Sequence, residues 1–436
     1  MIFKILKELG YVRRMFVIST KKGIYHSWGG DNGEIESWLE FADLRWTILH
    51  GDDKERNLDS DADIFLINPA GLKWFFGAHS EGRKKLVLDW SRFKKVGCDM
   101  LLVDESTDFK ASDSQRFKIL RQAVPKFKRR YILTGTPSPN GLMDLFGQIY
   151  ILDEGNALGS YITHYRNNFF YPSGSGGYTW IPQAGAIDRI SAKIAPLVLR
   201  MEAKDHLTEL PELIFDKRWV ELPPEAITVY KQMEDALIAV LESEEFVAAN
   251  EAVAAGKCRQ ICAGGLYSTD VFGKRDHVVI HEAKLDALSE LLDELMGDPI
   301  LLFYEFNFEK EMLKKRFPFA KFLDGGKNEP DTISAFNRGE LPLVCGQPAS
   351  ASKSINMQKS CGHVGWLTQT WKSDDHKQGI DRVLRQGNSR QYVVSHYFMV
   401  KGTIDEIVFA RIVQKDKLSA DLSTAIKRLR DIAIGV

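Results

Sequence analysis

The chain is 436 residues long, with 44% hydrophobic and 27% charged residues, a globular composition that excludes a disordered chain, a collagen-like fibre and a disulfide scaffold. Its 58 Lys and Arg residues against 59 Asp and Glu residues give a net charge of −1, which argues against a surface that is basic throughout but leaves room for a local basic groove. The length predicts two to three domains of about 150 residues each. Five cysteines and the absence of a long apolar run predict a cytoplasmic protein without a transmembrane helix.

The first half of the chain alternates short apolar runs with helical patterns. An amphipathic helix is predicted over residues 1–9, and it ends at Gly10, a usual residue just past a helix. Four apolar runs follow, at residues 15–19, 63–68, 100–104 and 130–134. A helical pattern at residues 112–124 lies between the last two runs. This alternation predicts an α/β domain with a parallel sheet.

The second half of the chain repeats the same alternation after two interruptions. Residues 171–186 are rich in Gly, Ser, Pro and aromatic residues, which predicts an exposed excursion. A helical stretch is predicted over residues 224–263, with Pro224 at its first turn. Apolar runs then return at residues 299–304, 341–345, 363–367 and 392–397. We therefore expect two α/β domains, 1–205 and 206–436, the second with a helical insertion at about 224–263.

Two adjacent carboxylates, Asp104 and Glu105, end the apolar run at residues 100–104. Ligands bind at the carboxyl ends of strands in open α/β sheets. Asp104 there can hold Mg²⁺ with waters between, and Glu105 can orient or deprotonate an attacking water. The alternative is a solvated strand end without a function.

The segment Leu-Thr-Gly-Thr-Pro, residues 133–137, follows the next apolar run. Its small hydroxyl residues beside a glycine let the backbone approach phosphate or carboxylate oxygens, although a plain turn is the alternative. We call Asp104 and Glu105 the carboxylate turn, and Phe109-Lys110 lies between it and this segment. Together, these segments resemble superfamily-two helicases and translocases of the Swi/Snf-like branch. In that family the carboxylate turn corresponds to motif II and the Leu-Thr-Gly-Thr-Pro segment to motif III. The string at residues 140–150 resembles the segment that follows motif III in that family.

The resemblance covers nearly the whole chain and is closest to short phage-type members of the branch. It implies two RecA-like lobes with parallel sheets, and a motor that uses ATP and Mg²⁺ and acts on DNA in a bacterial or phage-infected cell. It also implies that Asp104 binds the metal, that Glu105 is catalytic and that Thr136 contacts the nucleotide.

Residues 378–387 are similar to motif VI of the family. Arg382 and Arg385 are three positions apart, so on a helix they would share one face, and guanidinium groups suit phosphate oxygens. The resemblance implies that Gln378 and both arginines engage the nucleotide from the second lobe, the arginines as arginine fingers. The alternative is a solvent-facing basic helix that pairs with nearby acids such as Asp374.

The family also predicts nucleic-acid contacts through phosphates, which give affinity without sequence readout. Residues 348–358 resemble motif V, and short segments after the first two predicted strands resemble motifs Ia and Ib. The residues that carry over are Lys21, Asn68, Ser350, Asn356 and Gln358. Trp371 either belongs to the core or borders the DNA path.

The chain contains no phosphate loop of the form G-x-x-x-x-G-K-[ST], whose lysine reaches the nucleotide phosphates. In relatives this loop precedes the helix that corresponds to residues 1–9. We therefore expect a truncated or split reading frame or an internal start, with a missing N-terminal segment, and poor ATP binding by these 436 residues alone. The alternative from another class is a non-hydrolysing DNA-binding or adaptor remnant of such a motor.

Overall fold

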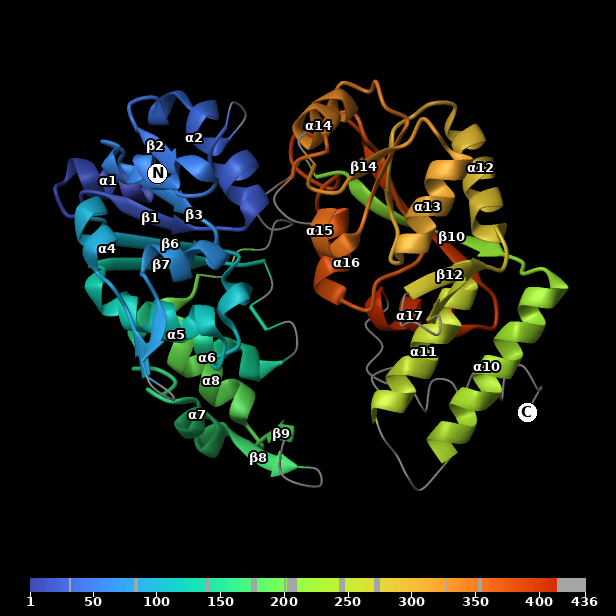
Figure 1. Ribbon diagram of the computed structural model, residues 1–436, viewed down its shortest axis with the longest axis horizontal. Coiled ribbons are helices and arrows are strands. Elements are labelled where there is room, and N and C mark those ends of the chain that lie inside the picture. Colours follow the sequence, from blue (N-terminus) through green and yellow to red (C-terminus); the bar gives the residue numbers. More distant parts are fainter. Residues whose placement is uncertain are drawn as a thin grey trace. The chain divides into compact units, whose positions relative to one another are not determined.

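The computed structural model describes residues 1–30, 33–81, 85–135, 137–138, 141–173, 179–199, 201, 210–242, 248–269, 275–326, 328–351 and 355–413. The chain divides into two compact units, Met1–Glu202 and Ala203–Val436 (Figure 1). None of the helices in these ranges is long and apolar enough to cross a membrane.

The first unit is built on a five-stranded parallel sheet with the strand order β2-β3-β1-β6-β7. The strands are β1 (Met15–Ile18), β2 (Trp46–Ile48), β3 (Ile64–Ile67), β6 (Met100–Asp104) and β7 (Arg129–Leu133). Four of them coincide with the predicted apolar runs. The sequence did not predict β2, because it has only three residues and all three are partly exposed.

Both faces of the sheet are buried at β1 and β3, which explains why these strands are continuously apolar. In β1, Phe16 and Ile18 belong to one hydrophobic cluster, and Met15 and Val17 belong to another. Successive side chains of a strand point to opposite faces, so the two clusters lie on the two sides of the sheet. The α/β class predicted from the sequence is confirmed.

Helices and two hairpins complete the first unit. The helices are α1 (Ile2–Glu8), α2 (Glu34–Ser37), α3 (Leu72–Phe75), α4 (Ser91–Val96), α5 (Gln115–Ala123), α6 (Leu145–Asp153), α7 (Ile162–Phe169) and α8 (Ala186–Ile194). Short helical turns include the π-helix η1 (Gly23–Trp28) and the 3-10 turns η5 (Pro69–Gly71), η6 (Ser106–Phe109) and η8 (Leu142–Asp144). The hairpins are β4–β5 (His79–Glu81, Lys85–Val87) and β8–β9 (Phe170–Ser173, Thr179–Pro182). The β8–β9 hairpin occupies the predicted excursion.

The second unit is built on a six-stranded parallel sheet with the order β10-β17-β16-β13-β15-β14. Its strands are β10 (Glu212–Val220), β13 (Ile300–Phe303), β14 (Lys321–Leu323), β15 (Leu343–Gly346), β16 (His363–Trp366) and β17 (Tyr392–Val400). Its other helices are α12 (Ala283–Leu295), α13 (Asn307–Arg316), α14 (Glu329–Asn337), α15 (Pro348–Ala351), α16 (Ser373–Ile380) and α17 (Ile404–Ile412).

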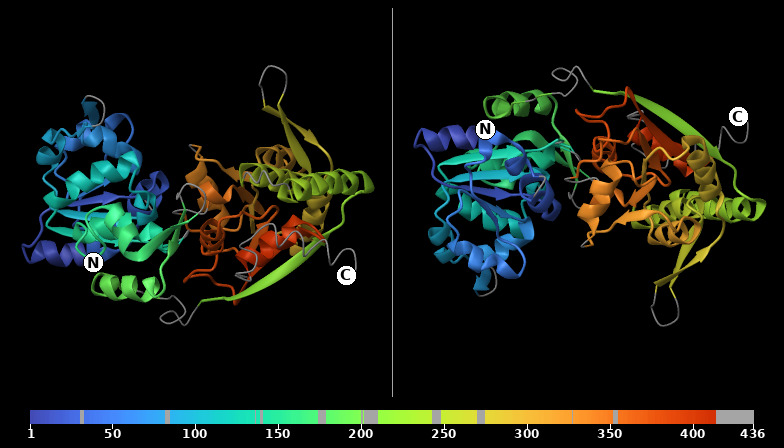
Figure 2. Two further views of the ribbon diagram at one scale, coloured as in Figure 1. Left: turned by 90° about the horizontal axis from the view of Figure 1, so that it is seen from below. Right: turned by 90° about the horizontal axis from the view of Figure 1, so that it is seen from above.

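The predicted helical insertion consists of two helices, α10 (Pro224–Glu242) and α11 (Ala248–Cys262). It begins at Pro224, as the sequence predicted, and residues 243–247 lie outside the described ranges. A hairpin, β11–β12 (Gly265–Thr269, Arg275–Val279), follows α11. Figure 2 shows this yellow hairpin projecting from the second unit and the long green β10 at the edge of its sheet.

Candidate functional site

Asp104 lies at the carboxyl end of β6, and one of its two carboxylate oxygens is held by the rest of the first unit. Oδ2 accepts a hydrogen bond from Ser19 Oγ, just past β1, at 2.9 Å and another from Trp28 Nε1, in η1, at 3.0 Å. Oδ1 accepts no hydrogen bond from the described residues. The carboxylate is therefore oriented by two donors while one oxygen stays available.

Glu105 adopts a left-handed backbone conformation, with φ 55° and ψ 56°. A non-glycine residue in this region carries about 1–3 kcal/mol of strain and keeps it only where its surroundings impose it. Both neighbours of Glu105 are fixed by hydrogen bonds. Asp104 is held by Ser19 and Trp28, and Ser106 donates a buried hydrogen bond to Gln148. The sharp turn therefore sets the direction of the Glu105 side chain relative to Asp104.

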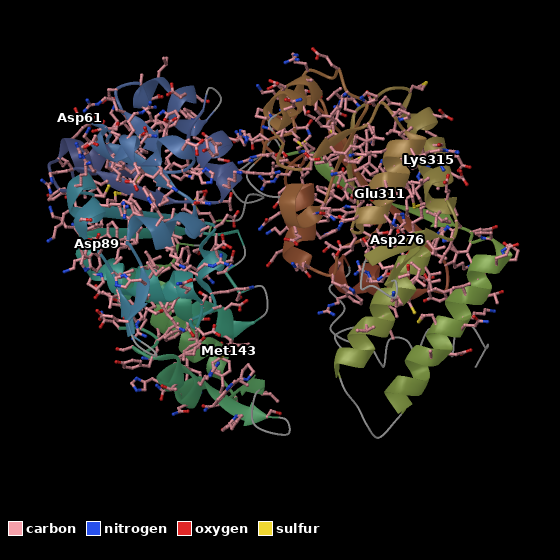
Figure 3. The ribbon with its side chains drawn as sticks, in the orientation of Figure 1. Asp61, Asp89, Met143, Asp276, Glu311 and Lys315 are labelled. Carbon is pink, nitrogen blue, oxygen red and sulfur yellow. The ribbon has the colours of Figure 1, made fainter. Side chains whose placement is uncertain are left out.

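Gln148 connects the carboxylate turn to the Thr-Gly-Thr-Pro segment. It lies on α6, after the η8 turn whose Met143 is labelled in Figure 3, and its side chain is fully buried. Its Oε1 accepts from Ser106 Oγ at 2.7 Å, and its Nε2 donates to the Pro137 carbonyl at 2.6 Å and to the Asp144 carbonyl at 2.8 Å. One amide thus ties together the segments that resemble motifs II and III. Thr136, the predicted nucleotide contact of the second segment, lies outside the described residues.

In the second unit, the prediction that Arg382 and Arg385 share a helical face is wrong. The helix α16 ends at Ile380, so both arginines lie in the turns that follow it. The Arg382 guanidinium donates through Nε to the Gln378 carbonyl at 3.0 Å, the carbonyl that an α-helix would pair with the Arg382 backbone N–H. That N–H bonds instead to the Gly379 carbonyl at 3.3 Å. The side chain of Arg382 therefore takes the place of the next helical hydrogen bond.

The two arginines bind the segment that resembles motif V. Arg382 Nη1 donates to the Ile355 carbonyl at 3.0 Å, and Arg385 Nη1 donates to Asn356 Oδ1. Burial raises the pKa of the neighbouring Asp381 carboxyl, against the opposing charges of Lys377 and both arginines. The structure therefore brings together Asn356, Arg382 and Arg385, which the sequence had assigned to two different tasks.

Two further predicted residues carry buried amide oxygens. Gln358 Oε1 and Gln378 Oε1 are buried and accept no hydrogen bond from the described residues. A buried polar atom of this kind calls for a donor from water or from a bound molecule. Ser350 lies on α15, and its side chain is not among those that the structure describes.

The two predicted nucleic-acid residues of the first unit lie just past neighbouring strands. Lys21 is exposed and precedes η1. Asn68 caps η5, with its Oδ1 accepting from the Gly71 backbone N–H at 3.1 Å. Since β1 is parallel to both β3 and β6, Lys21 and Asn68 lie past the carboxyl ends of their strands, at the same end of the sheet as Asp104.

Trp371 packs at the border of the second unit's core. Its ring is partly buried against a core cluster, and the guanidinium carbons of Arg259 and Arg411 lie 5.3 and 5.4 Å from the ring centroid. Arg259 is itself buried and donates to the Gln369 carbonyl at 2.5 Å. These contacts favour the core alternative for Trp371 and leave its relation to a DNA path as a hypothesis.

Asp104 meets the requirement for a Mg²⁺ ligand, because Mg²⁺ binds through one or two carboxylates and keeps several waters. The hydrogen bonds from Ser19 and Trp28 hold its carboxylate in a fixed orientation. No cluster of three or more His, Cys, Asp or Glu side chains that would hold a metal on its own is found among the residues that the structure describes.

Sequence reasoning missed Ser19, Trp28 and Gln148. Ser19 belongs to a predicted apolar run, and Trp28 looks like an ordinary aromatic residue 76 positions from its partner. Gln148 is the one amide in the otherwise apolar stretch Leu145–Asp153 before its final aspartate. For Gln148, the available signal was one polar side chain within an apolar stretch.

Comparisons with known proteins identify the family of the chain. The SNF2-related domain matches residues 2–264. "Putative protein p41" of Acyrthosiphon pisum secondary endosymbiont phage 1 is 32% identical over 410 residues, which cover 91% of this chain and 85% of that protein. The ISWI chromatin-remodeling complex ATPase ISW1 of Saccharomyces cerevisiae is 22% identical over 453 residues, 94% of this chain and 36% of that protein.

A bacterial helicase and a solved structure are also similar to this chain. The uncharacterized ATP-dependent helicase MG018 of Mycoplasma genitalium is 27% identical over 343 residues, 76% of this chain and 31% of that protein. This chain therefore spans about a third of the length of the yeast and Mycoplasma relatives. Among solved structures, the Sulfolobus solfataricus SWI2/SNF2 ATPase core in complex with dsDNA matches at 22% identity with a TM-score of 0.39, over 98% of this chain and 88% of that chain.

Proposed function

Because this chain belongs to the SNF2-related domain family, we propose that it is a DNA-dependent ATPase that moves along duplex DNA or remodels branched DNA. Relatives are named as an ATPase and as an ATP-dependent helicase. The observation that carries the proposal is the carboxylate turn, in which Asp104 keeps one oxygen available and Glu105 is held in a strained conformation. Strain of this kind is typical of active sites.

The chemistry of the carboxylate turn follows from its two acids. Asp104 would hold Mg²⁺, and the ion would supply positive charge near the phosphate oxygens. Glu105 would orient the attacking water and accept its proton. Thr136 and Gln378 would contact the nucleotide.

The two arginines would have different tasks in this reaction. The Arg382 guanidinium donates hydrogen bonds to the Gln378 and Ile355 carbonyls. We therefore assign to Arg382 the task of fixing the segment that resembles motif V. Arg385 is exposed and makes its hydrogen bond to a side chain. We therefore assign to Arg385 the positive charge that stabilises the transferred phosphoryl group, an effect worth roughly 10³–10⁵ in rate in related chemistry.

DNA would be bound mainly through its phosphates. The proposed contacts are Lys21, Asn68, Ser350, Asn356 and Gln358. Contacts to phosphate and sugar position a protein on DNA and carry no direct sequence information.

A second candidate function is favoured by one specific observation. The 436 residues contain no G-x-x-x-x-G-K-[ST] sequence, and the amides and lysine of that loop cradle the nucleotide phosphates. A non-hydrolysing DNA-binding protein or adaptor built on this fold would need neither the loop nor Glu105.

Equilibrium binding to short labelled duplexes tests the DNA part of the proposal. We expect the polypeptide of residues 1–436 to bind duplexes of unrelated sequence with similar affinity. The logarithm of the binding constant should fall linearly with the logarithm of the salt concentration, by about 0.9 for each phosphate contact made. An affinity that does not change with salt, or a strong preference for one short sequence, would contradict the proposal.

A further inference from the structure

Arg259, near the end of α11, is a buried cation that the helical insertion contributes to the second unit. Only 5% of its surface is exposed, and a buried charge is costly unless partners surround it. Its Nη2 donates to the Gln369 carbonyl and lies 3.9 Å from Oε1 of Glu305. The insertion therefore carries a charge whose polar partners lie outside the insertion.

Two aromatic rings lie close to this guanidinium. Its central carbon is 5.3 Å from the centroid of the Trp371 ring and 5.6 Å from the centroid of the Phe306 ring. Phe306 stacks in turn on Phe308, with the ring centroids 5.3 Å apart and the ring planes 10° from parallel. Each ring attracts a nearby cation through its quadrupole. Arg259 thus contacts both the segment after β13 and the segment after β16.

Residues 367–372 connect β16 to α16, and side chains from two other elements hold this connection. Glu309 of α13 accepts a buried hydrogen bond from the Thr368 hydroxyl at 2.8 Å. Arg259 of α11 holds the next residue through the Gln369 carbonyl. The Gln369 side chain does not hold the connection, because its buried Nε2 and Oε1 have no partner among the described residues. The position of the connection therefore depends on α13 and on the insertion.

We propose that Arg259 is a positioning residue through which the helical insertion sets the start of α16. Gln378, a proposed nucleotide contact, lies on the same helix, and a rigid helix carries a displacement of its first turn to its far end. A change in α11 that moves Arg259 would therefore change the position of Gln378. The inference rests on the proposed function for the task of Gln378, whereas the link between α11 and α16 does not.

Hydrogen exchange of the backbone amides of residues 367–380, measured by mass spectrometry on the 436-residue chain, tests the proposal. Arg259→Met keeps a long side chain but removes the charge and the donors. We expect it to speed exchange in this segment about 10-fold, because the Gln369 carbonyl stays buried and loses a hydrogen bond from a charged group. Amides of β13 and β15 should speed up much less. A general loss of stability would instead speed exchange throughout the second unit.

Three further variants show which property of Arg259 matters. Arg259→Lys keeps a charge and a donor on a side chain without the planar fork, so it should speed exchange less than Arg259→Met does. Gln369→Leu removes the unpartnered amide from the same connection and should leave the exchange as in the wild type. Arg411→Ala removes an exposed cation 5.4 Å from the Trp371 ring and should also change nothing.

Three results would overturn the proposal. They are unchanged exchange of residues 367–380 in Arg259→Met, an equal increase in β13 and β15, and exchange in Arg259→Lys as fast as in Arg259→Met. If Arg259→Met does not fold, Arg259→Lys carries the test, and an increase confined to residues 367–380 is the expected result. The experiment contains neither DNA nor ATP. A failure of the proposed function would therefore appear in the duplex-binding measurement and leave the exchange result unchanged.

Discussion

Gln148 shows at the scale of one residue how the candidate site is held. Its amide satisfies the Ser106 hydroxyl and the Pro137 carbonyl from two segments that the sequence separates by about 30 residues. A buried polar group costs most when its partner is removed, because the remaining group loses water without gaining a hydrogen bond. Gln148 is therefore needed for the position of the carboxylate turn as well as for stability.

We expect Gln148→Leu to lower the free energy of unfolding by about 1–3 kcal/mol, since a leucine of similar volume leaves buried polar groups without partners. Urea denaturation of the variant and the wild type measures this difference. The matched control is Gln122→Leu, since Gln122 is exposed and its single hydrogen bond to the Leu86 carbonyl is long, at 3.4 Å. Equal losses in both variants would contradict the role given to Gln148.

The residues that the sequence identified and those it missed differ in the range of their contacts. Asp104 ends, and Glu105 directly follows, a strand that is recognisable from its own composition. Trp28 and Gln148 become important only because the fold brings η1 and α6 to that strand end. A single sequence carries no signal for such pairs beyond the polarity of one side chain, so tertiary packing alone reveals them.

At the scale of elements, strands with apolar sequences were predictable, including the partly exposed β7, whereas the short β2 and the edge strand β10 were not. The strands β1, β3, β6 and β13 have both faces covered and therefore appear in the sequence as continuous apolar runs. The edge strand β10 has an irregular burial pattern and was not predicted. Its nine pairs with β17 are set by the fold rather than by its own composition.

The end of α16 shows where local periodicity fails. The three-residue spacing of Arg382 and Arg385 predicted a shared helical face, yet the chain leaves the helix at Ile380. The reason is a tertiary one, because Arg382 binds the Gln378 carbonyl and the Ile355 carbonyl at once. Hydrogen bonds to a distant segment thus outweigh the continuation of the helix.

The packing of α16 also makes a prediction about acid stability. His376 on this helix is buried, stacks near Trp366 and contacts the Tyr397 hydroxyl at 2.8 Å. Burial lowers the pKa of His376 to about 4. In the unfolded chain the pKa returns to about 6.5, so the unfolded state binds more protons between these values and the free energy of unfolding falls as the pH drops from 6.5 toward 4.

We therefore expect the wild type to lose stability between pH 7 and pH 5, and His376→Gln to lose less over the same interval. Urea denaturation at the two pH values measures this. Part of the loss should remain in the variant, because burial also lowers the pKa of His363 to about 4. His79→Gln, which changes an exposed histidine, serves as control, and a variant of His376 with the full wild-type loss would contradict the prediction.

At the scale of the whole molecule, the proposed function needs a phosphate loop, and the 436 residues contain no G-x-x-x-x-G-K-[ST] sequence. Three features point to hydrolysis as the task of the fold: the oriented Asp104, the strained Glu105 and the exposed Arg385. A protein that only binds DNA would have no use for a strained carboxylate beside a second, oriented carboxylate.

The rate of ATP hydrolysis with and without duplex DNA tests whether the carboxylate turn is a catalytic centre. It is measured for residues 1–436 and for the same polypeptide preceded by a G-x-x-x-x-G-K-[ST] segment, the latter also as Glu105→Gln and Arg385→Ala. We expect little hydrolysis from residues 1–436 and DNA-stimulated hydrolysis from the extended protein. Both substitutions should abolish turnover, because one removes the group that activates water and the other removes charge needed in the transition state. Both variants should still bind DNA, and Glu105→Gln should still bind ATP.

Two results would contradict the account. Robust DNA-stimulated hydrolysis by residues 1–436 alone would show that the phosphate loop is not needed here. Hydrolysis at the wild-type rate by the extended Glu105→Gln protein would show that the carboxylate turn is not the catalytic centre.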